Sequence, residues 1–168
     1  MKNHPPFAAI ATAGLIAGIL DISSAIVLTL IYGGKPMRML QGIAAGALGP
    51  ASLQGGAATA FLGLGFHFLI AFTATALYYS ASRRLPALVE RPFVFGPLYG
   101  IAVWLFMQFV VIPLSRLKPR PLSLRSVATQ LPIHMVLVGL TIALVLRRFL
   151  IATPQPRSGT ARSFHPAG

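Results

Sequence analysis

The chain has 168 residues, of which 55% are hydrophobic and only 10% are charged, whereas about 25% of the residues in soluble proteins carry a charge. This composition excludes an ordinary soluble domain and indicates a membrane protein. The net charge of +12 arises in short basic runs between long apolar segments, a pattern of membrane anchors and not of a nucleic-acid-binding face. Because cysteine is absent, disulfides, thiolate metal sites and cysteine nucleophiles are excluded.

Four apolar stretches are long enough to cross a bilayer, because a transmembrane helix needs about 20 mostly apolar residues. They cover residues 7–31, 55–79, 93–114 and 127–146. The first contains Asp21, which costs roughly 3 kcal/mol near the centre of a helix, but its many Leu, Ile and Val residues offset that cost. The sequence therefore predicts an all-α integral membrane protein, with a four-helix transmembrane bundle in residues 1–150.

Residues 37–48, between the first two spans, are too short to cross a membrane. Gly33, Gly34 and Pro36 end the first helix before them, and their apolar residues recur at helical spacing. We therefore expect a short helix after the first span, interfacial or re-entrant, and we assign it as interfacial. Residues 151–168 follow the last span and contain several prolines and two arginines, which predicts a disordered basic tail.

Basic residues fall on both sides of the predicted bundle. The side that holds both termini has eight: Lys2, Arg83, Arg84, Arg91, Arg147, Arg148, Arg157 and Arg162. The opposite side has six: Lys35, Arg38, Arg116, Lys118, Arg120 and Arg125. Because cytoplasmic loops carry the excess of Lys and Arg, this small bias predicts that both termini are cytoplasmic.

Asp21 lies within the apolar slab, where ionisable groups are costly and usually face the interior of a bundle. Gly14 and Gly18 share its helix face, so a neighbouring helix can approach closely there. Two interpretations have equal weight. Asp21 handles a proton or a cation, or it is a structural acid that hydrogen-bonds to Ser23, Ser24 or another helix.

Three more polar side chains are expected at a similar depth: His67 in the second span, Gln108 in the third and His134 in the fourth. If successive helices alternate in direction, these three residues and Asp21 form one intramembrane polar layer. The alternative for each histidine is a structural one, because histidine also serves as a hydrogen-bond partner between membrane helices.

Three uses of such a layer are open. An acid with two histidines suits proton or ion handling, because histidine titrates near neutral pH. One histidine on each of two spans suits the axial ligation of a b-type haem. A metal site is the weakest of the three, since Asp21, His67 and His134 offer three ligands without a second acid. No metal and no cofactor is therefore assigned.

Motifs of soluble-type catalysis do not occur in the chain: it has no HExxH, no P-loop, no nucleophile elbow and no carboxylate pair. The sequence therefore predicts a protein that is not an enzyme. The basic linker of residues 115–126 has two interpretations, as an ordinary topological anchor or as a binding site for anionic lipid headgroups.

The first and third spans each contain a GxxxG pattern, Gly14 with Gly18 and Gly96 with Gly100, which favours close helix packing. The second and fourth spans each contain one histidine and precede paired arginines, so the chain has the pattern of a duplicated two-helix hairpin. Four short helices bury few residues among themselves, which favours a homo-oligomer or a larger membrane complex.

Scattered positions in residues 66–148 carry a resemblance to a known family. They are His67, the Leu-Tyr-Tyr run ending at Tyr79, Leu85 with Pro86, Gly96, Gly100, residues 109–113, His134 and Arg147 with Arg148. In these positions, and in Gly-Leu-Ile-Ala-Gly at 14–18, the chain resembles the YagU-like family of uncharacterised bacterial inner-membrane proteins. The region 32–54 departs from that family. The resemblance implies a bacterial inner membrane and no established catalytic residues.

The sequence thus predicts a multi-pass membrane protein that contacts lipids and binds no nucleic acid. Its first functional interpretation is a structural or accessory membrane component, in which the polar layer only fixes packing. The alternatives are a small proton- or ion-coupled transporter or pH-responsive channel that uses the layer, and a b-type haem-binding membrane protein.

Overall fold

The computed structural model describes residues 6–117 and 121–151. The predicted tail therefore lies outside the described residues, apart from its first residue. Along the two described stretches the chain forms helices joined by short turns, and no strand is present. This confirms the all-α fold class.

Four helical segments in the described part of the chain are long and apolar enough to cross a membrane: Pro6–Ile31, Gly56–Ser82, Pro92–Leu114 and Leu124–Ile151. The first two are the continuous helices α1 and α3. The third consists of α5 (Pro92–Phe106), the π-helical segment η2 (Met107–Val111) and α6 (Ile112–Leu114). The fourth consists of α7 (Leu124–Ile133), the π-helical segment η3 (His134–Leu140) and α8 (Thr141–Ile151). The chain is a multi-pass helical membrane protein.

Three shorter helices connect the spans: α2 (Pro36–Leu48), the 3₁₀ helix η1 (Pro50–Gln54) and α4 (Ala87–Glu90). Helix α2 occupies the segment for which the sequence predicts a short helix. The last span begins before the predicted residue 127 because Ser123 caps it, its hydroxyl oxygen accepting from the Ser126 N–H at 3.1 Å. It also continues past residue 146 through both arginines that follow.

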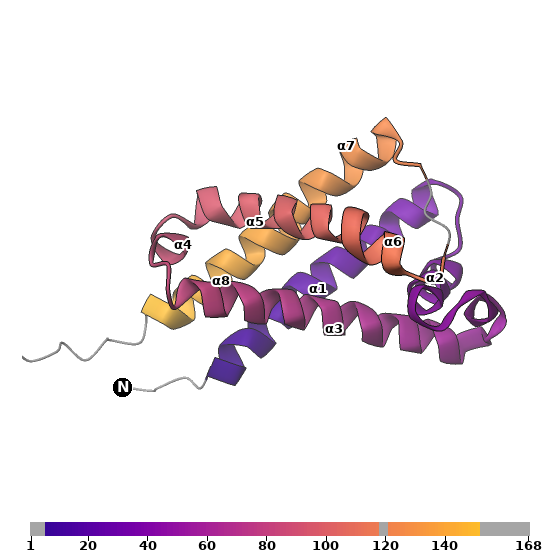
Figure 1. Ribbon diagram of the computed structural model, residues 1–168, viewed down its shortest axis with the longest axis horizontal. Coiled ribbons are helices and arrows are strands. Elements are labelled where there is room, and N and C mark those ends of the chain that lie inside the picture. Colours follow the sequence, from indigo (N-terminus) through magenta and orange to yellow (C-terminus); the bar gives the residue numbers. More distant parts are fainter. Residues whose placement is uncertain (1–5, 118–120, 152–168) are drawn as a thin grey trace, which may run out of the picture.

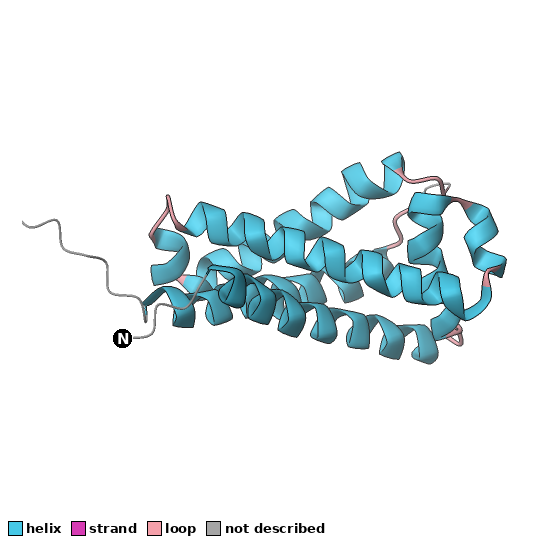
Figure 2. Cartoon of the chain, turned by 90° about the horizontal axis from the view of Figure 1, so that it is seen from below, coloured by secondary structure: helices cyan, strands magenta, loops and turns pink. Residues whose placement is uncertain are grey.

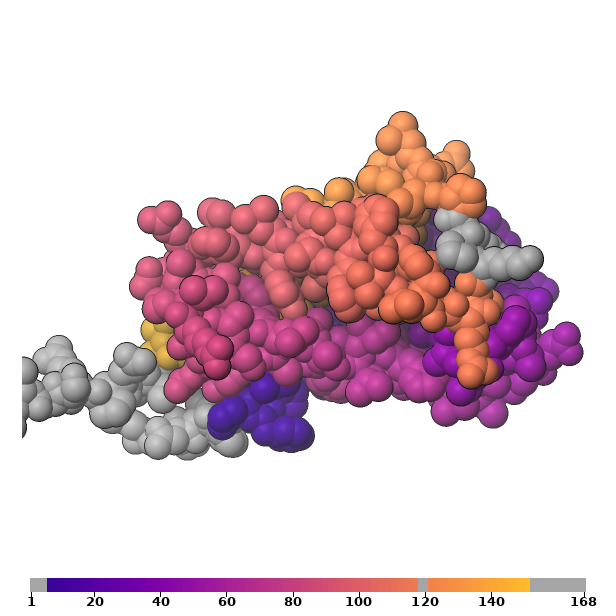
Figure 3. Space-filling view, in the orientation of Figure 1, coloured from indigo at the N-terminus to yellow at the C-terminus, as the bar shows by residue number. Residues whose placement is uncertain are grey.

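The bundle has two unlike ends, seen in Figure 1 and, from below, in Figure 2. The end with the start of α1, α4 and the finish of α8 is called the α4 end, and the other, with α2 and α6, the α2 end. The buried core lies toward the α4 end and contains Ala9, Ala13, Ala17, Tyr78, Val138, Ile142, Ala143 and Leu146. Toward the α2 end, α7 leans away from α5 and stands clear of the surface (Figure 3). The spans are therefore packed at one end and divergent at the other.

The third and fourth spans meet through three glycines, Gly96 and Gly100 on α5 and Gly139 on η3. A Cβ on Gly100 would overlap the carbonyl oxygen of His134 and lie 2.6 Å from the Cα of Met135. A Cβ on Gly139 would overlap the carbonyl oxygen of Gly96. The two backbones can approach this closely because no side chain separates them.

Helix α2 packs against the first turns of α3. A Cβ on Gly63 would overlap the carbonyl oxygen of Leu40, and Gln41 donates from Nε2 to the Gly56 carbonyl oxygen at 3.0 Å. Gln41 is only 4% exposed, so this hydrogen bond is shielded. The contact places α2 across the α2 end of the bundle (Figure 1).

Replacing Gly63 with valine is expected to separate α2 from α3, because the new side chain meets backbone that cannot move aside. Overpacking costs about 1–3 kcal/mol, which shifts the equilibrium between the packed and the separated arrangement of α2 and α3 by about tenfold or more. The chain has no cysteine, so a Gln41→Cys substitution introduces a single reporter. Its rate of maleimide labelling is compared between the protein with Gly63 and the protein with Gly63→Val. Gly65→Val is the matched control, because apart from the neighbouring backbone of its own helix no atom lies within 4 Å of a Cβ added there. Equal labelling rates in all three proteins would contradict the contact.

Candidate functional site

The contact between α1 and α3 depends on the glycine face of the first span. A Cβ on Gly14 would lie 2.5 Å from Cδ1 of Phe72, and one on Gly18 would lie 2.7 Å from Cε1 of Phe68. The two phenylalanine rings of α3 therefore occupy the surface that the glycines leave open. This close approach brings the backbone of α1 within reach of His67, the residue before Phe68 on α3.

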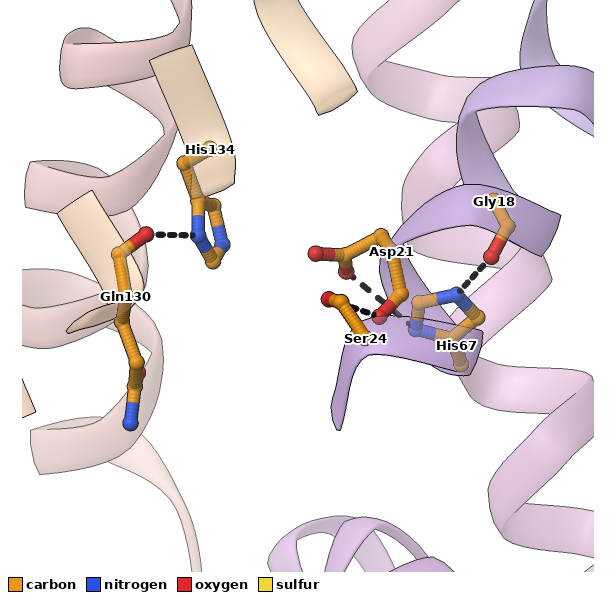
Figure 4. Close-up of polar contacts among 6 residues, drawn as sticks. All are labelled: Gly18, Asp21, Ser24, His67, Gln130 and His134. Atoms are coloured by element: carbon orange, nitrogen blue, oxygen red, sulfur yellow. Dashed lines mark hydrogen bonds and ion pairs between the residues drawn. The ribbon is translucent and has the colours of Figure 1, made fainter. Parts of the chain in front are cut away.

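His67 joins the two helices by both of its ring nitrogens (Figure 4). Its Nε2 lies 2.9 Å from the carbonyl oxygen of Gly18, and its Nδ1 lies 4.0 Å from Oδ2 of Asp21. The side chain of His67 is 13% exposed and that of Asp21 is 22% exposed. The structure therefore brings these two predicted residues together in a largely shielded pair.

The Gly18 carbonyl decides how the His67 ring is arranged. A carbonyl oxygen only accepts, so the hydrogen bond requires a proton on Nε2, and in a neutral ring Nδ1 then has only a lone pair. That lone pair faces the carboxylate of Asp21. At 4.0 Å, Nδ1 and Oδ2 are too far apart for a hydrogen bond, so the imidazole and the carboxylate are close neighbours across the contact between α1 and α3.

The carboxylate of Asp21 is not occupied by the neighbouring serines. Ser24 donates its hydroxyl to the backbone carbonyl oxygen of Asp21 at 2.7 Å, not to the carboxylate (Figure 4). Ser23 is exposed on the surface of α1. Of the structural partners expected from the sequence, the one that the structure supplies to the carboxylate is His67 of the neighbouring helix.

His134 and Gln108 take different places from the Asp21–His67 pair. His134 is bound to its own helix, with Nδ1 at 2.9 Å from the Gln130 carbonyl oxygen. In Figure 4, His134 lies apart from Asp21 on another helix, and no hydrogen bond is drawn between the two. Gln108 lies on η2 and lines a cavity. The four residues of the predicted polar layer therefore do not meet. Asp21 and His67 form a pair, whereas His134 and Gln108 lie elsewhere.

The cavity lies between the diverging spans and has a volume of about 1220 Å³. It is lined from α2, from the middle of α3, from η2 and α6, and from α7, and Thr29 of α1 also reaches it. Most of the wall is apolar, with Gln108, Ser126 and Gln130 as polar side chains on the third and fourth spans. Gln130 donates from Nε2 to the Ser126 hydroxyl oxygen at 3.1 Å. The cavity is the space that the leaning of α7 leaves unfilled.

The Asp21–His67 pair lies directly behind one wall of this cavity. Phe66 and Ile70, on either side of His67 in α3, both line the cavity, while the His67 ring is turned toward α1. Two turns beyond Asp21 on α1, Thr29 lines it as well. The pair therefore joins α1 and α3, two helices that also contribute side chains to the cavity wall.

Metal and haem ligation do not fit the described residues. They contain no group of three His, Asp or Glu side chains that would hold a metal ion. A haem between the histidines would need one free ring nitrogen from each, but in His67 one nitrogen is bonded to Gly18 and the other faces Asp21. The pair must be broken before His67 can bind iron.

The basic linker is only partly within the described residues, because Lys118 and Arg120 lie outside them. The guanidinium of Arg125 lies 5.6 Å from the centre of the Tyr32 ring, a cation–π contact with the end of the first span. The Arg116 N–H donates to the Gly46 carbonyl oxygen at 2.9 Å. These contacts fasten the described part of the linker to the end of α1 and to α2.

Sequence reasoning did not identify Gly139 or the basic edge of the cavity formed by Lys35 and Arg38. A signal for Gly139 was present, since it is a lone glycine in an apolar span that also contains His134. Lys35 and Arg38 resemble ordinary flanking anchors, and only the position of α2 turns them toward a cavity.

Comparison with protein-family models, with curated proteins and with solved structures finds no match for this chain. Fold and site together define a small multi-pass helical membrane protein with a one-sided cavity and an intramembrane Asp–His pair.

Proposed function

We propose that this protein is a small proton-coupled membrane carrier. The observation that supports this most directly is the cavity of about 1220 Å³, which opens between diverging spans at one end of the bundle. Carriers bind their substrates between helices, frequently where spans are interrupted. Here the third span lines the cavity with the π-helical segment η2, and such segments are common at functional sites. The fourth span has its π-helical segment, η3, just beyond the lining residue Gln130.

The Asp21–His67 pair supplies the proton coupling in this proposal. In this proposal a proton gained by the pair alters the contact between α1 and α3, because a charged His67 ring would attract the Asp21 carboxylate across the 4.0 Å between Nδ1 and Oδ2. The same two helices carry Thr29, Phe66 and Ile70 into the cavity wall. Proton uptake therefore favours one arrangement of the wall over another, which is the condition for coupling.

The second candidate is a structural or accessory membrane component, in which the polar residues only hold helices together. The observation that favours it is the hydrogen bond from His67 to the Gly18 carbonyl oxygen, which fastens the glycine face of α1 to α3. The proposal of a carrier includes no enzymatic step and no resident cofactor. A homo-oligomer or a larger membrane complex is compatible with both candidates, and large apolar side chains such as Phe61 face outward, where lipid contacts them.

Two single-cysteine reporters separate the candidates. Gln108→Cys lies in the cavity, and Thr75→Cys lies near the α4 end at a position that is 0% exposed. In liposomes, a carrier exposes each reporter in turn, so both react with a charged thiol reagent, and between about pH 8 and pH 5 their rates change in opposite directions. Reaction of the Gln108→Cys reporter alone, at every pH, would contradict the carrier and favour the structural component.

We further propose that the protein resides in a bacterial inner membrane with the α4 end in the cytoplasm. The resemblance to the YagU-like family supports the bacterial inner membrane, and the small excess of basic residues on the side of the termini supports the orientation.

Membrane orientation is measured with two exposed positions in intact bacterial cells. A Gln54→Cys reporter next to α2 is expected to react with an impermeant maleimide, whereas a Glu90→Cys reporter in α4 is expected to react only after the membrane is permeabilised. Permeabilised cells serve as the control for reactivity. The reverse labelling pattern would invert the proposed orientation and leave the fold unaffected.

A further inference from the structure

The cavity wall is apolar over most of its area and basic at one edge. The wall is formed by large apolar side chains of α3, α5 and η2 and of the segment just before α7: Phe66, Ile70, Phe106, Val110 and Leu122. The cations among its lining residues, Lys35 and Arg38, both belong to the start of α2. Among the described residues that line the cavity, none carries a carboxylate. Such a distribution suits a ligand with a long apolar part and an anionic head.

The basic edge is held in position by the backbone around it. Arg38 donates from Nη1 to the Leu53 carbonyl oxygen at 2.6 Å, which orients the guanidinium and leaves further N–H donors of its planar group for a ligand. Lys35 is the N-cap of α2 and makes no side-chain capping hydrogen bond. The positive end of this 13-residue helix therefore adds to the two side-chain charges.

The cavity is also open sideways, toward the position of the surrounding lipid. Three of its lining side chains are largely exposed, so the cavity is not enclosed there: Leu69 at 61%, Phe106 at 57% and Leu114 at 81%. A membrane lipid can therefore enter between the spans while its headgroup stays at the level of α2. A small water-soluble anion has no apolar part that could pack against this wall.

We infer that the cavity binds an anionic phospholipid, with its phosphate against Lys35 and Arg38 and its acyl chains along the apolar wall. This inference rests on the proposed carrier function and names its substrate class. The volume of about 1220 Å³ exceeds the range of about 300–1,000 Å³ typical of pockets for drug-sized ligands, as a two-chain ligand requires. Gln108 and Gln130 provide amide groups beside the chains for the glycerol esters.

The single tryptophan of the chain gives a direct measurement. Trp104 is buried on α5, one turn before Gln108, and bromine atoms on a lipid chain in the cavity would quench its fluorescence. The purified full chain in neutral detergent micelles is titrated with brominated phosphatidylglycerol or with brominated phosphatidylcholine carrying the same chains. Half-maximal quenching is expected at about tenfold lower concentration for the anionic lipid, because two cations near the phosphate each favour it.

The double variant Lys35→Gln/Arg38→Gln is expected to lose this tenfold preference while phosphatidylcholine quenches as before. Its matched control is Arg83→Gln/Arg84→Gln, which removes the same charge at the α4 end and should keep the preference. A third variant, Gly42→Phe, adds a ring at a cavity-lining position with no atom within 4 Å, and should weaken quenching by both lipids. Circular dichroism verifies that each variant is folded.

Three results would overturn the inference: equal quenching by the two lipids in the parent protein, an equal loss of preference in both charge variants, or displacement of phosphatidylglycerol by inorganic phosphate. Failure of this site and failure of the carrier proposal are distinguishable. Preferred quenching by phosphatidylglycerol with an unreactive Thr75→Cys reporter would support the lipid site and contradict the carrier. A reactive reporter with equal quenching would support a carrier of another substrate and overturn the lipid site.

Discussion

Replacing Gly100 with alanine is expected to destabilise the bundle by about 3 kcal/mol, a large effect for one methyl group. The added Cβ would overlap the His134 carbonyl oxygen and approach the Cα of Met135, both of which belong to backbone. Neither α5 nor η3 can yield without separating the third and fourth spans. Trp104 lies one turn away on the same helix, so its fluorescence reports the unfolding of this contact in detergent.

Gly65→Ala is the control for this experiment. It makes the same change in a membrane helix, but apart from the neighbouring backbone of α3 itself no atom lies within 4 Å of the new Cβ. The free energy of unfolding should therefore stay within about 0.5 kcal/mol of the parent. Equal stability of the Gly100→Ala and Gly65→Ala proteins would show that α5 and η3 are not in backbone contact.

Replacing Asp21 with asparagine is expected to abolish the pH dependence of the two cysteine reporters. Asparagine keeps the size and hydrogen-bonding capacity of the side chain but carries no charge that would attract a charged His67 ring. We expect the ratio of labelling rates at Gln108→Cys and Thr75→Cys to change by about tenfold or more between about pH 8 and pH 5 in the parent, and to be constant in the variant.

The chain supplies a matched control in Glu90, its other acid, which lies exposed at the end of α4. Glu90→Gln removes the same charge and should leave the pH dependence intact. If Asp21→Asn instead unfolds the protein in detergent while the parent shows no pH-dependent labelling, the pair is structural and the carrier proposal fails.

The position of each polar residue along its span follows from the sequence, but its partner does not. Asp21 and His67 meet, whereas His134 bonds to the backbone of its own helix and Gln108 faces the cavity. Position along a span follows from counting residues at a fixed rise. Rotation about the helix axis does not, because a span that is apolar all round has no polar face to orient it.

Helix interruptions made that rotation harder still to predict. The π-helical segments η2 and η3 change the direction of every side chain that follows them, and they contain Gln108 and Gly139. Pro113 and Pro132 lie next to these segments, and proline removes a backbone donor and disturbs the preceding turn. The prolines are visible in the sequence. The direction in which the later side chains point is not, because it depends on the packing of the α5 glycines against η3.

By itself, the sequence determined the spans and the short helix between the first two. Apolar length is sufficient for that purpose, because a backbone in hydrocarbon must satisfy its own hydrogen bonds and does so as a helix. Only the tertiary structure decided which polar residues pair and that the spans diverge toward α2. The physical reason is that backbone contacts at Gly18, Gly100 and Gly139, made between segments distant in the chain, set the rotation and lean of the helices. The cavity and its basic edge follow from that arrangement.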